Sequence, residues 1–242
     1  MGPADLPVPV LNDAYWRVNI RPDIYQPELI PSLKACFELV QKTKVRLRGW
    51  DYPHLSREEL ERGQGTNWIA SWCDFMGQRE YWRLYQSGQF LHLFSVSETM
   101  SREWREKLAQ DLRHHLRGDV PKKIAGYISI LNFLYTITEI FEFAARLSQR
   151  LPYQGEIEIS IRLNGIKGFA LVPEWDRSWD ICCVAEENEL GHAWTLRTDA
   201  LVSGNADYSL KAVMWFFERF GWLDPSAEVL RSDQQRFLAG KS

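Results

Sequence analysis

Two arginines and a tryptophan in the run RLRGW form the first group of side chains that could bind a ligand. Segment 44–50 alternates in character, which predicts a strand with Arg46, Arg48 and Trp50 on one face. Guanidinium groups hold anions through paired hydrogen bonds. The segment therefore predicts an anion-binding face. The structural alternative is that both arginines pair with nearby acidic side chains.

Asp51 and His54 follow directly, in the turn sequence DYPH. Binding and catalytic residues are often found on such connections at the ends of regular elements. A carboxylate beside an imidazole can orient it for acid–base chemistry, so the pair is the candidate catalytic group. The alternative is that Asp51 caps the turn and His54 is an ordinary surface residue.

A second candidate lies in YWRLYQSGQF, where Tyr81, Arg83 and Tyr85 alternate with Trp82 and Leu84. Alternation predicts a strand that presents the two tyrosines and the arginine on one face. Aromatic rings interleaved with arginine can stack on bases or grip a peptide. The alternative is that these residues form cross-strand packing pairs.

Residues 124–151 form the longest apolar stretch, and its apolar residues recur at helical spacing. A helix that is apolar over most of its circumference must be enclosed by protein. Its narrow polar stripe includes Glu139, Glu142 and Arg146, which are spaced to pair along the helix. The functional alternative is a buried carboxylate with a raised pKa that serves a pocket. These polar groups argue against a membrane span.

Alternation, helical periodicity and turn residues predict the elements around this helix. The expected strands are 15–20, 44–50, 67–75, 79–86, 89–96, 156–163, 166–172, 179–185 and 192–197, and the expected helices are 27–42, 101–117, 124–151, 206–220 and 225–239. The sequence Asn164-Gly165 favours a type I′ turn, so 156–163 and 166–172 are expected to form a hairpin.

This order of elements predicts an α+β fold with mostly antiparallel sheets in two packed halves around the long buried helix. Residues 1–13 contain three prolines and no periodicity, so they are expected to be a flexible leader. Residues 14–242 are expected to form one compact unit. Two subdomains, 14–97 and 122–223, linked by helix 101–117, are the finer alternative.

Composition narrows the classes of function. The chain has 45% hydrophobic and 25% charged residues, as in ordinary globular proteins, but 13% are aromatic, including 11 tryptophans. That aromatic content indicates either a bulky core or an adhesive interface. A net charge of −3 argues against a dominant electrostatic attraction to nucleic acid, although a local basic patch is compatible with it.

Motifs for standard chemistry are missing from the sequence. It contains no Walker or Rossmann glycine loop, zinc-protease helix, nucleophile elbow or EF-hand loop, so we expect no cofactor. The cysteines lack metal-ligand or disulfide spacing, so we expect no metal site and a reduced, cytoplasmic environment; they are Cys36, Cys73, Cys182 and Cys183. No signal-peptide pattern is visible at the start.

Three runs of the sequence, RLRGWDYPH, NWIASW and YWRLYQSGQFLHLFS, resemble a segment of uncharacterised bacterial proteins associated with Schlafen-like AlbA DNA-binding domains. The resemblance implies a bacterial, cytosolic accessory module in a regulatory or defence system. The AlbA-like domain itself is not visible in this chain, so the resemblance transfers no residue role.

The leading functional prediction is a non-catalytic recognition module that binds a protein or nucleic-acid partner, without contacting a membrane. Its expected binding surface consists of Arg46, Arg48, Trp50, Tyr81, Arg83 and Tyr85. The first alternative is a hydrolase or nuclease-like enzyme that uses Asp51 and His54. The second is an oligomerisation unit that self-associates through the aromatic segment 215–222.

Overall fold

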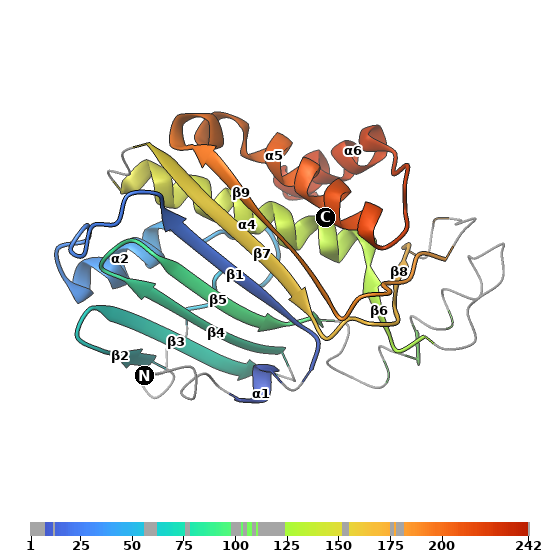
Figure 1. Cartoon of the computed structure of the whole chain (residues 1–242), viewed down its shortest axis with the longest axis horizontal. Helices are drawn as coiled ribbons and strands as arrows, with labels where there is room; N and C mark the ends of the chain where they lie inside the picture. The colour runs from blue at the N-terminus through green and yellow to red at the C-terminus, as the bar shows by residue number, and fades with distance from the viewer. Residues whose placement is uncertain are drawn as a thin grey trace.

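The computed structural model of the chain describes residues 8–11, 13–55, 62–75, 78–97, 103, 106–107, 110, 124–151, 155–174, 177 and 182–241. Seven strands form one antiparallel sheet (Figure 1). Their order across the sheet is β2 (Arg62–Gln64), β3 (Trp68–Phe75), β4 (Gln78–Tyr85), β5 (Phe90–Ser95), β1 (Tyr15–Pro22), β7 (Glu156–Asn164) and β9 (Glu189–Arg197).

Helices and a small second sheet complete the fold. The helices are α1 (Val8–Leu11), α2 (Leu33–Thr43), α4 (Ile130–Arg150), α5 (Thr198–Arg219) and α6 (Ala227–Leu238), and the parallel pair of strands is β6 (Gly126–Ser129) and β8 (Phe169–Val172). Buried side chains of α2, α4, α5 and α6 share one core with a single face of the large sheet, which we call the inner face. The α+β class is therefore confirmed.

Helix α4 is the long central helix that the apolar run predicted. It begins after Ser129, whose side chain accepts a hydrogen bond from the backbone N–H of Asn132. Inner-face strands lie on one side of α4, and α5 and α6 pack on another, as Figure 1 shows. None of the described helices combines the length and the apolar character needed to cross a membrane.

Aromatic rings make up much of this core. Phe133 of α4 lies 4.8 Å from the ring of Trp16 on β1 and 5.1 to 6.2 Å from three phenylalanine rings of the α5 segment, namely Phe216, Phe217 and Phe220. Edge-on and tilted contacts of this kind are favourable beyond the apolar area that they bury. The high aromatic content therefore supplies the packing between α4 and its neighbours.

Strand β1 joins the two parts of the chain that the sequence assigned to separate halves. It pairs with β5 along one edge and with β7 along the other, antiparallel in both cases. The inward alternation of Trp16, Val18 and Ile20 continues into the isoleucines of β7. Strands from 14–97 and from 122–223 thus belong to one continuous sheet.

Two predictions around α4 and β7 were wrong. Residues 126–129 form β6, so the helix begins at Ile130 rather than at residue 124. The chain does turn at Gly165, where φ is +74°, but β8 does not return along β7. Strand β7 instead pairs with β1 and β9 over eight and nine residue pairs, which satisfies far more backbone groups than a four-residue β8 can.

The predicted strand 44–50 was also wrong. This segment is irregular, and its regular pairing is limited to one isolated bridge between Val45 and Tyr52. The alternation reflects a loop with Val45 buried and Arg46 exposed, rather than a strand of the sheet. Within 179–185 the described part has one bridge, from Val184 to Ala170.

Two other predicted segments lie partly outside the described residues. Of the expected helix 101–117, residues 103, 106, 107 and 110 are described, and they are helical. In the expected leader, residues 8–11 form α1, and Val10 is buried against the sheet face opposite to α4, which we call the outer face. A proline-rich segment this short has no periodicity from which such docking could be predicted.

We predict that Phe133→Ala lowers the free energy of unfolding by about 3–5 kcal/mol, because the truncation leaves a cavity among four aromatic rings. Leu131→Ala, on the half-buried side of the same helix, should lower it by only about 1 kcal/mol. Urea denaturation followed by tryptophan fluorescence measures both values. Equal losses would contradict the placement of Phe133 at the centre of the core.

Candidate functional site

A cavity of about 460 Å³ lies between the inner face of the sheet and α4. Strands β4 and β5 form its floor, α4 forms one wall, and the irregular loop 48–52 forms another. Its lining residues are Trp16, Arg48, Gly49, Trp50, Asp51, Tyr52, Gln78, Glu80, His92, Phe94, Ser95, Ser97, Asn132, Thr136 and Glu139. The volume falls within the range of small-molecule sites, and the polar lining sits within an apolar core.

Glu80 places a carboxylate on the floor of this cavity. Its Oε1 accepts a hydrogen bond of 2.7 Å from the backbone N–H of His54, and its Oε2 accepts one of 3.1 Å from Trp50 Nε1. His92 Nε2 lies 2.9 Å from Oε1 in an ion-pair contact without hydrogen-bond alignment. Burial by itself would raise the pKa of Glu80, but the adjacent His92 side chain and these hydrogen bonds outweigh it and lower the pKa.

Glu139 faces the cavity from α4, with 1% of its surface exposed. Arg48 donates to Glu139 Oε2 through Nη2 at 2.5 Å and through Nε at 3.1 Å, and the same Nη2 donates to Thr136 at 3.1 Å. Burial raises the pKa of Glu139, and Arg48 offsets only part of that effect; the nearby charge of Glu80 raises it further. The polar stripe of the central helix therefore contributes a buried carboxylate to a pocket.

Tyr52 brings a hydroxyl group close to both carboxylates. Burial raises its pKa well above the ordinary value, and the charges of Glu80 and Glu139 add to that shift. Its ring is fixed edge-on against those of His92, at 5.0 Å, and Phe94, at 6.0 Å. The hydroxyl oxygen has no hydrogen-bond partner among the described residues.

Unpartnered polar atoms are concentrated in this cavity. Five buried side-chain nitrogen and oxygen atoms in the described ranges lack a hydrogen-bond partner, and four of them belong to cavity residues. They are Tyr52 Oη, His92 Nδ1 and Glu139 Oε1, together with His92 Nε2, which keeps its ion-pair contact with Glu80. Each buried polar atom without a partner costs about 1–3 kcal/mol, so these atoms would gain from a hydrogen bond to a bound water molecule or ligand.

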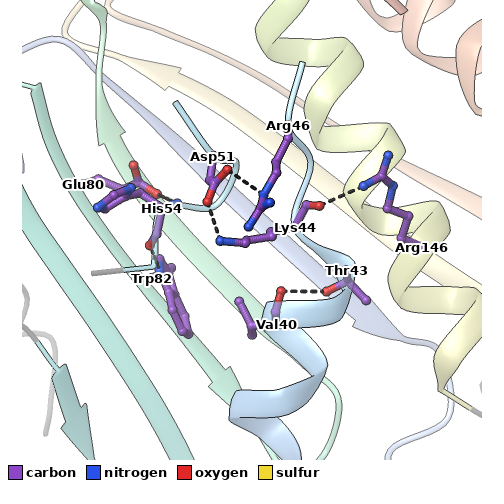
Figure 2. A network of polar contacts seen from close by, with 9 residues as sticks. All are labelled: Val40, Thr43, Lys44, Arg46, Asp51, His54, Glu80, Trp82 and Arg146. Carbon is purple, nitrogen blue, oxygen red and sulfur yellow. Dashed lines mark hydrogen bonds and ion pairs between the residues drawn. The ribbon is translucent and has the colours of Figure 1, made fainter. Parts of the chain in front are cut away.

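Ion pairs hold the loop that closes the cavity. Asp51 pairs with Lys44 and, at 3.1 Å, with Arg46, and Arg146 of α4 donates to the Lys44 carbonyl at 2.8 Å. Figure 2 shows Asp51 between Lys44 and Arg46, with His54 on the side of Glu80 and Trp82. The loop is thereby tied both to itself and to the central helix.

The structure separates the predicted acid–base pair. Asp51 lines the cavity and is engaged by two cations, whereas His54 is not a lining residue. The His54 ring stacks on Trp50 at 4.0 Å, and its carbonyl accepts a hydrogen bond of 2.6 Å from Trp82 Nε1. His54 therefore supports the loop through its ring and its backbone.

The six residues predicted as one binding surface lie in two places. Arg48 and Trp50 line the cavity, and the Arg46 side chain beside it is 68% exposed. Tyr81, Arg83 and Tyr85 belong to the outer face, because β4 alternates and Trp82 and Leu84 lie in the main core. The sheet itself therefore stands between the two groups.

On that outer face, Arg83 is almost entirely buried and is bound by its neighbours. It donates to the hydroxyl groups of Tyr81, at 2.6 and 2.9 Å, and Tyr85, at 3.0 Å. Its guanidinium lies 4.1 Å from the centre of a ring of Trp68. These contacts agree with the packing alternative that the sequence left open for this group.

Tyr52, Glu80 and His92 were not among the site residues predicted from the sequence. A usable signal was present, because Glu80 and His92 occupy positions of β4 and β5 whose neighbours on the same face are large apolar residues. A charged or titratable residue on an otherwise apolar strand face requires a partner or a role. Glu139 was recognised in the polar stripe, but its partner is Arg48, since Arg146 pairs with Glu142 at 2.7 Å.

Comparison with protein-family models, with curated proteins and with solved structures found no match to this chain. Within the described ranges, no group of three or more His, Cys, Asp and Glu side chains is arranged to hold a metal ion. The function is therefore inferred from the geometry of the cavity.

The two buried carboxylates should give opposite pH dependences of stability. The pKa of Glu139 is raised on folding. Its contribution to the free energy of unfolding is therefore full below the ordinary Glu pKa of about 4.3 and is lost as pH rises through the raised pKa. The pKa of Glu80 is lowered on folding. Its contribution to the free energy of unfolding is therefore full above pH about 4.3 and is lost as pH falls through the lowered pKa.

Urea titrations from below pH about 4 up to neutral pH test this prediction. The stability of the wild type relative to Glu139→Gln should fall as pH rises, whereas its stability relative to Glu80→Gln should fall as pH drops. Each variant is the control for the other, because both remove a buried carboxylate without changing its shape. Slopes of the same sign would contradict the assigned environments.

Proposed function

We propose that this protein is a non-catalytic recognition module whose cavity takes a planar, nucleobase-like ring from a nucleotide or from the end of a single-stranded nucleic acid. The observation that carries the proposal is that three residues lining one cavity, Tyr52, His92 and Glu139, carry buried polar atoms without a hydrogen-bond partner among the described residues. A carboxylate oxygen, a hydroxyl group and an imidazole together offer both acceptors and donors. A base edge presents the complementary mixture of donors and acceptors.

The apolar part of the lining supports a flat ring as the occupant. Trp16, Trp50, Tyr52 and Phe94 all contribute to the cavity wall. Aromatic side chains stack on bases with about 1–3 kcal/mol per base, whatever the sequence. Trp50 is also held in place by its contacts with Glu80 and His54, so little side-chain freedom would be lost on binding.

Cationic side chains beside the cavity support a phosphate-bearing ligand. Lys44 and Arg46 meet at Asp51, which is itself a lining residue, and the exposed Arg46 guanidinium faces solvent. Arginine and lysine in such a position favour an anionic group next to the bound ring. The net charge of −3 keeps that attraction local rather than general.

The broader setting belongs to the same proposal. A cytoplasmic, bacterial accessory role follows from the resemblance in sequence. A protein partner that inserts an aromatic side chain into the cavity is the alternative occupant. It has less support, because the cluster of unpartnered hydrogen-bonding atoms exceeds what one aromatic side chain can satisfy.

Acid–base catalysis at the same cavity is the second candidate. The supporting observation is that Tyr52 lies close enough to Glu80 and Glu139 for both charges to raise its pKa, because groups with shifted pKa values cluster at catalytic sites. The hydrolase alternative built on Asp51 and His54 has less support, since Asp51 is ion-paired and His54 stacks on Trp50.

We predict that Tyr52→Phe weakens ligand binding about two- to tenfold, as expected for the loss of one hydrogen bond. The same variant should be at least as stable as the wild type, because it removes a buried hydroxyl group without a partner. Isothermal titration calorimetry with the four ribonucleoside monophosphates and with single-stranded trinucleotides measures affinity. Thermal unfolding of the free protein measures stability.

Tyr81→Phe is the matched control for this experiment. Its hydroxyl group accepts hydrogen bonds from Arg83 on the outer face, so the variant should lose stability and keep the affinity. Trinucleotides with an abasic terminal sugar provide the second control, since they keep the phosphates and lack the ring. Equal binding of abasic and normal trinucleotides, or no binding of either, would overturn the proposal.

A further inference from the structure

Strand β9 ends the large sheet with a long unpaired edge. It pairs with β7 over nine residues, from Glu189 to Arg197, and the described residues place no strand on its other side. A strand at an edge presents a row of unpaired N–H and C=O groups that can pair with another chain. The opposite edge of the sheet is formed by β2, which has only three residues.

Strand β9 lacks the features that usually protect such an edge. Its sequence, ELGHAWTLR, contains no proline and no lysine, and its register with β7 runs without a bulge. No charged side chain points inward, since Leu190, His192, Trp194 and Leu196 occupy the inner face. Trp194 and Leu196 are only partly buried there.

We infer that β9 is a dimerisation edge that pairs antiparallel with β9 of a second copy of this chain, around a two-fold axis through Ala193. In this register Glu189 of each copy faces Arg197 of the other copy. On the inner face, Leu190 faces Leu196 and His192 faces Trp194. Every position of the nine-residue strand is thus paired with a residue of compatible character.

The symmetry of the strand restricts the choice of register. A two-fold axis perpendicular to the sheet keeps the inner faces of the two copies on the same side. Paired residues must therefore lie on the same face, so their numbers are both even or both odd. A shift by two residues in one direction would place Glu189 opposite Thr195 and leave Arg197 beyond the end of the partner strand, and the opposite shift would leave Glu189 beyond it. The register centred on Ala193 is the one that uses all nine residues and matches both charged ends.

This surface differs from the oligomerisation segment that the sequence predicted. In 215–222, Phe216, Phe217 and Phe220 are buried in the core of the same chain, so that segment has little apolar surface left for a partner. Strand β7 lies between the β9 edge and β1, which carries the cavity-lining residue Trp16. Dimerisation and ligand binding can therefore be tested independently.

A single cysteine tests the register directly. In Ala193→Cys the two introduced thiols face each other across the axis, at a separation that suits a disulfide. In the control Thr195→Cys, which is also exposed and lies on the same face, the two thiols lie about 13 Å apart along the strands. Under mild oxidation we expect rapid covalent dimers from the first variant only, judged by non-reducing gel electrophoresis against the unmodified protein.

Charge exchange tests the same interface in solution. Arg197→Glu and Glu189→Arg each place like charges opposite each other, and each should weaken the dimer about tenfold in light scattering. The double variant Glu189→Arg with Arg197→Glu should recover most of that loss, although it still lacks the pairs with Arg162 and Asp199 within one chain. A wild type that stays monomeric at its highest soluble concentration, equal cross-linking of the two cysteine variants, or no recovery in the double variant would overturn the inference.

Discussion

The enclosure of α4 is the constraint on which the rest of the structure depends. A 21-residue helix with fourteen buried residues cannot be covered by one neighbour, so a sheet and further helices are needed around it. The sheet supplies one side through a continuous apolar face, and α5 and α6 supply another. One wide sheet covers the helix better than two small sheets would. This requirement explains why both parts of the chain contribute strands to a single sheet.

The helix is not apolar all round, and the exception defines the candidate site. Glu139 lies where the polar stripe of α4 meets the inner face of the sheet, and burying this carboxylate requires a cation. Arg48 supplies it from a loop that belongs to neither layer. The loop therefore cannot pack flush against the sheet, and the cavity forms between the loop, the sheet and the helix.

The buried polar atoms of this cavity are unevenly supplied with hydrogen-bond partners. The Glu80 carboxylate is well supplied with hydrogen bonds, whereas one oxygen of Glu139, the Tyr52 hydroxyl and His92 Nδ1 are not. Natural cores seldom retain such atoms without a reason, because each lowers the stability of the fold. Their occurrence together, next to rings that could hold a flat ligand, separates this region from the rest of a well-packed core.

The sequence by itself determined the α+β class, the burial of the central helix and most strands of the sheet, because periodicity reports which face of an element is apolar. It also selected Arg48, Trp50 and Glu139. Only the tertiary structure decided that Glu80, His92 and Tyr52 join them, and that Tyr81, Arg83 and Tyr85 lie on the opposite face. Periodicity assigns a side chain to a face, but the partner of that face is chosen by the packing of distant segments. Residues 80, 92 and 139 come together through the register of β4 on β5 and the crossing of α4 over both strands. Local residue spacing predicts neither the register nor the crossing.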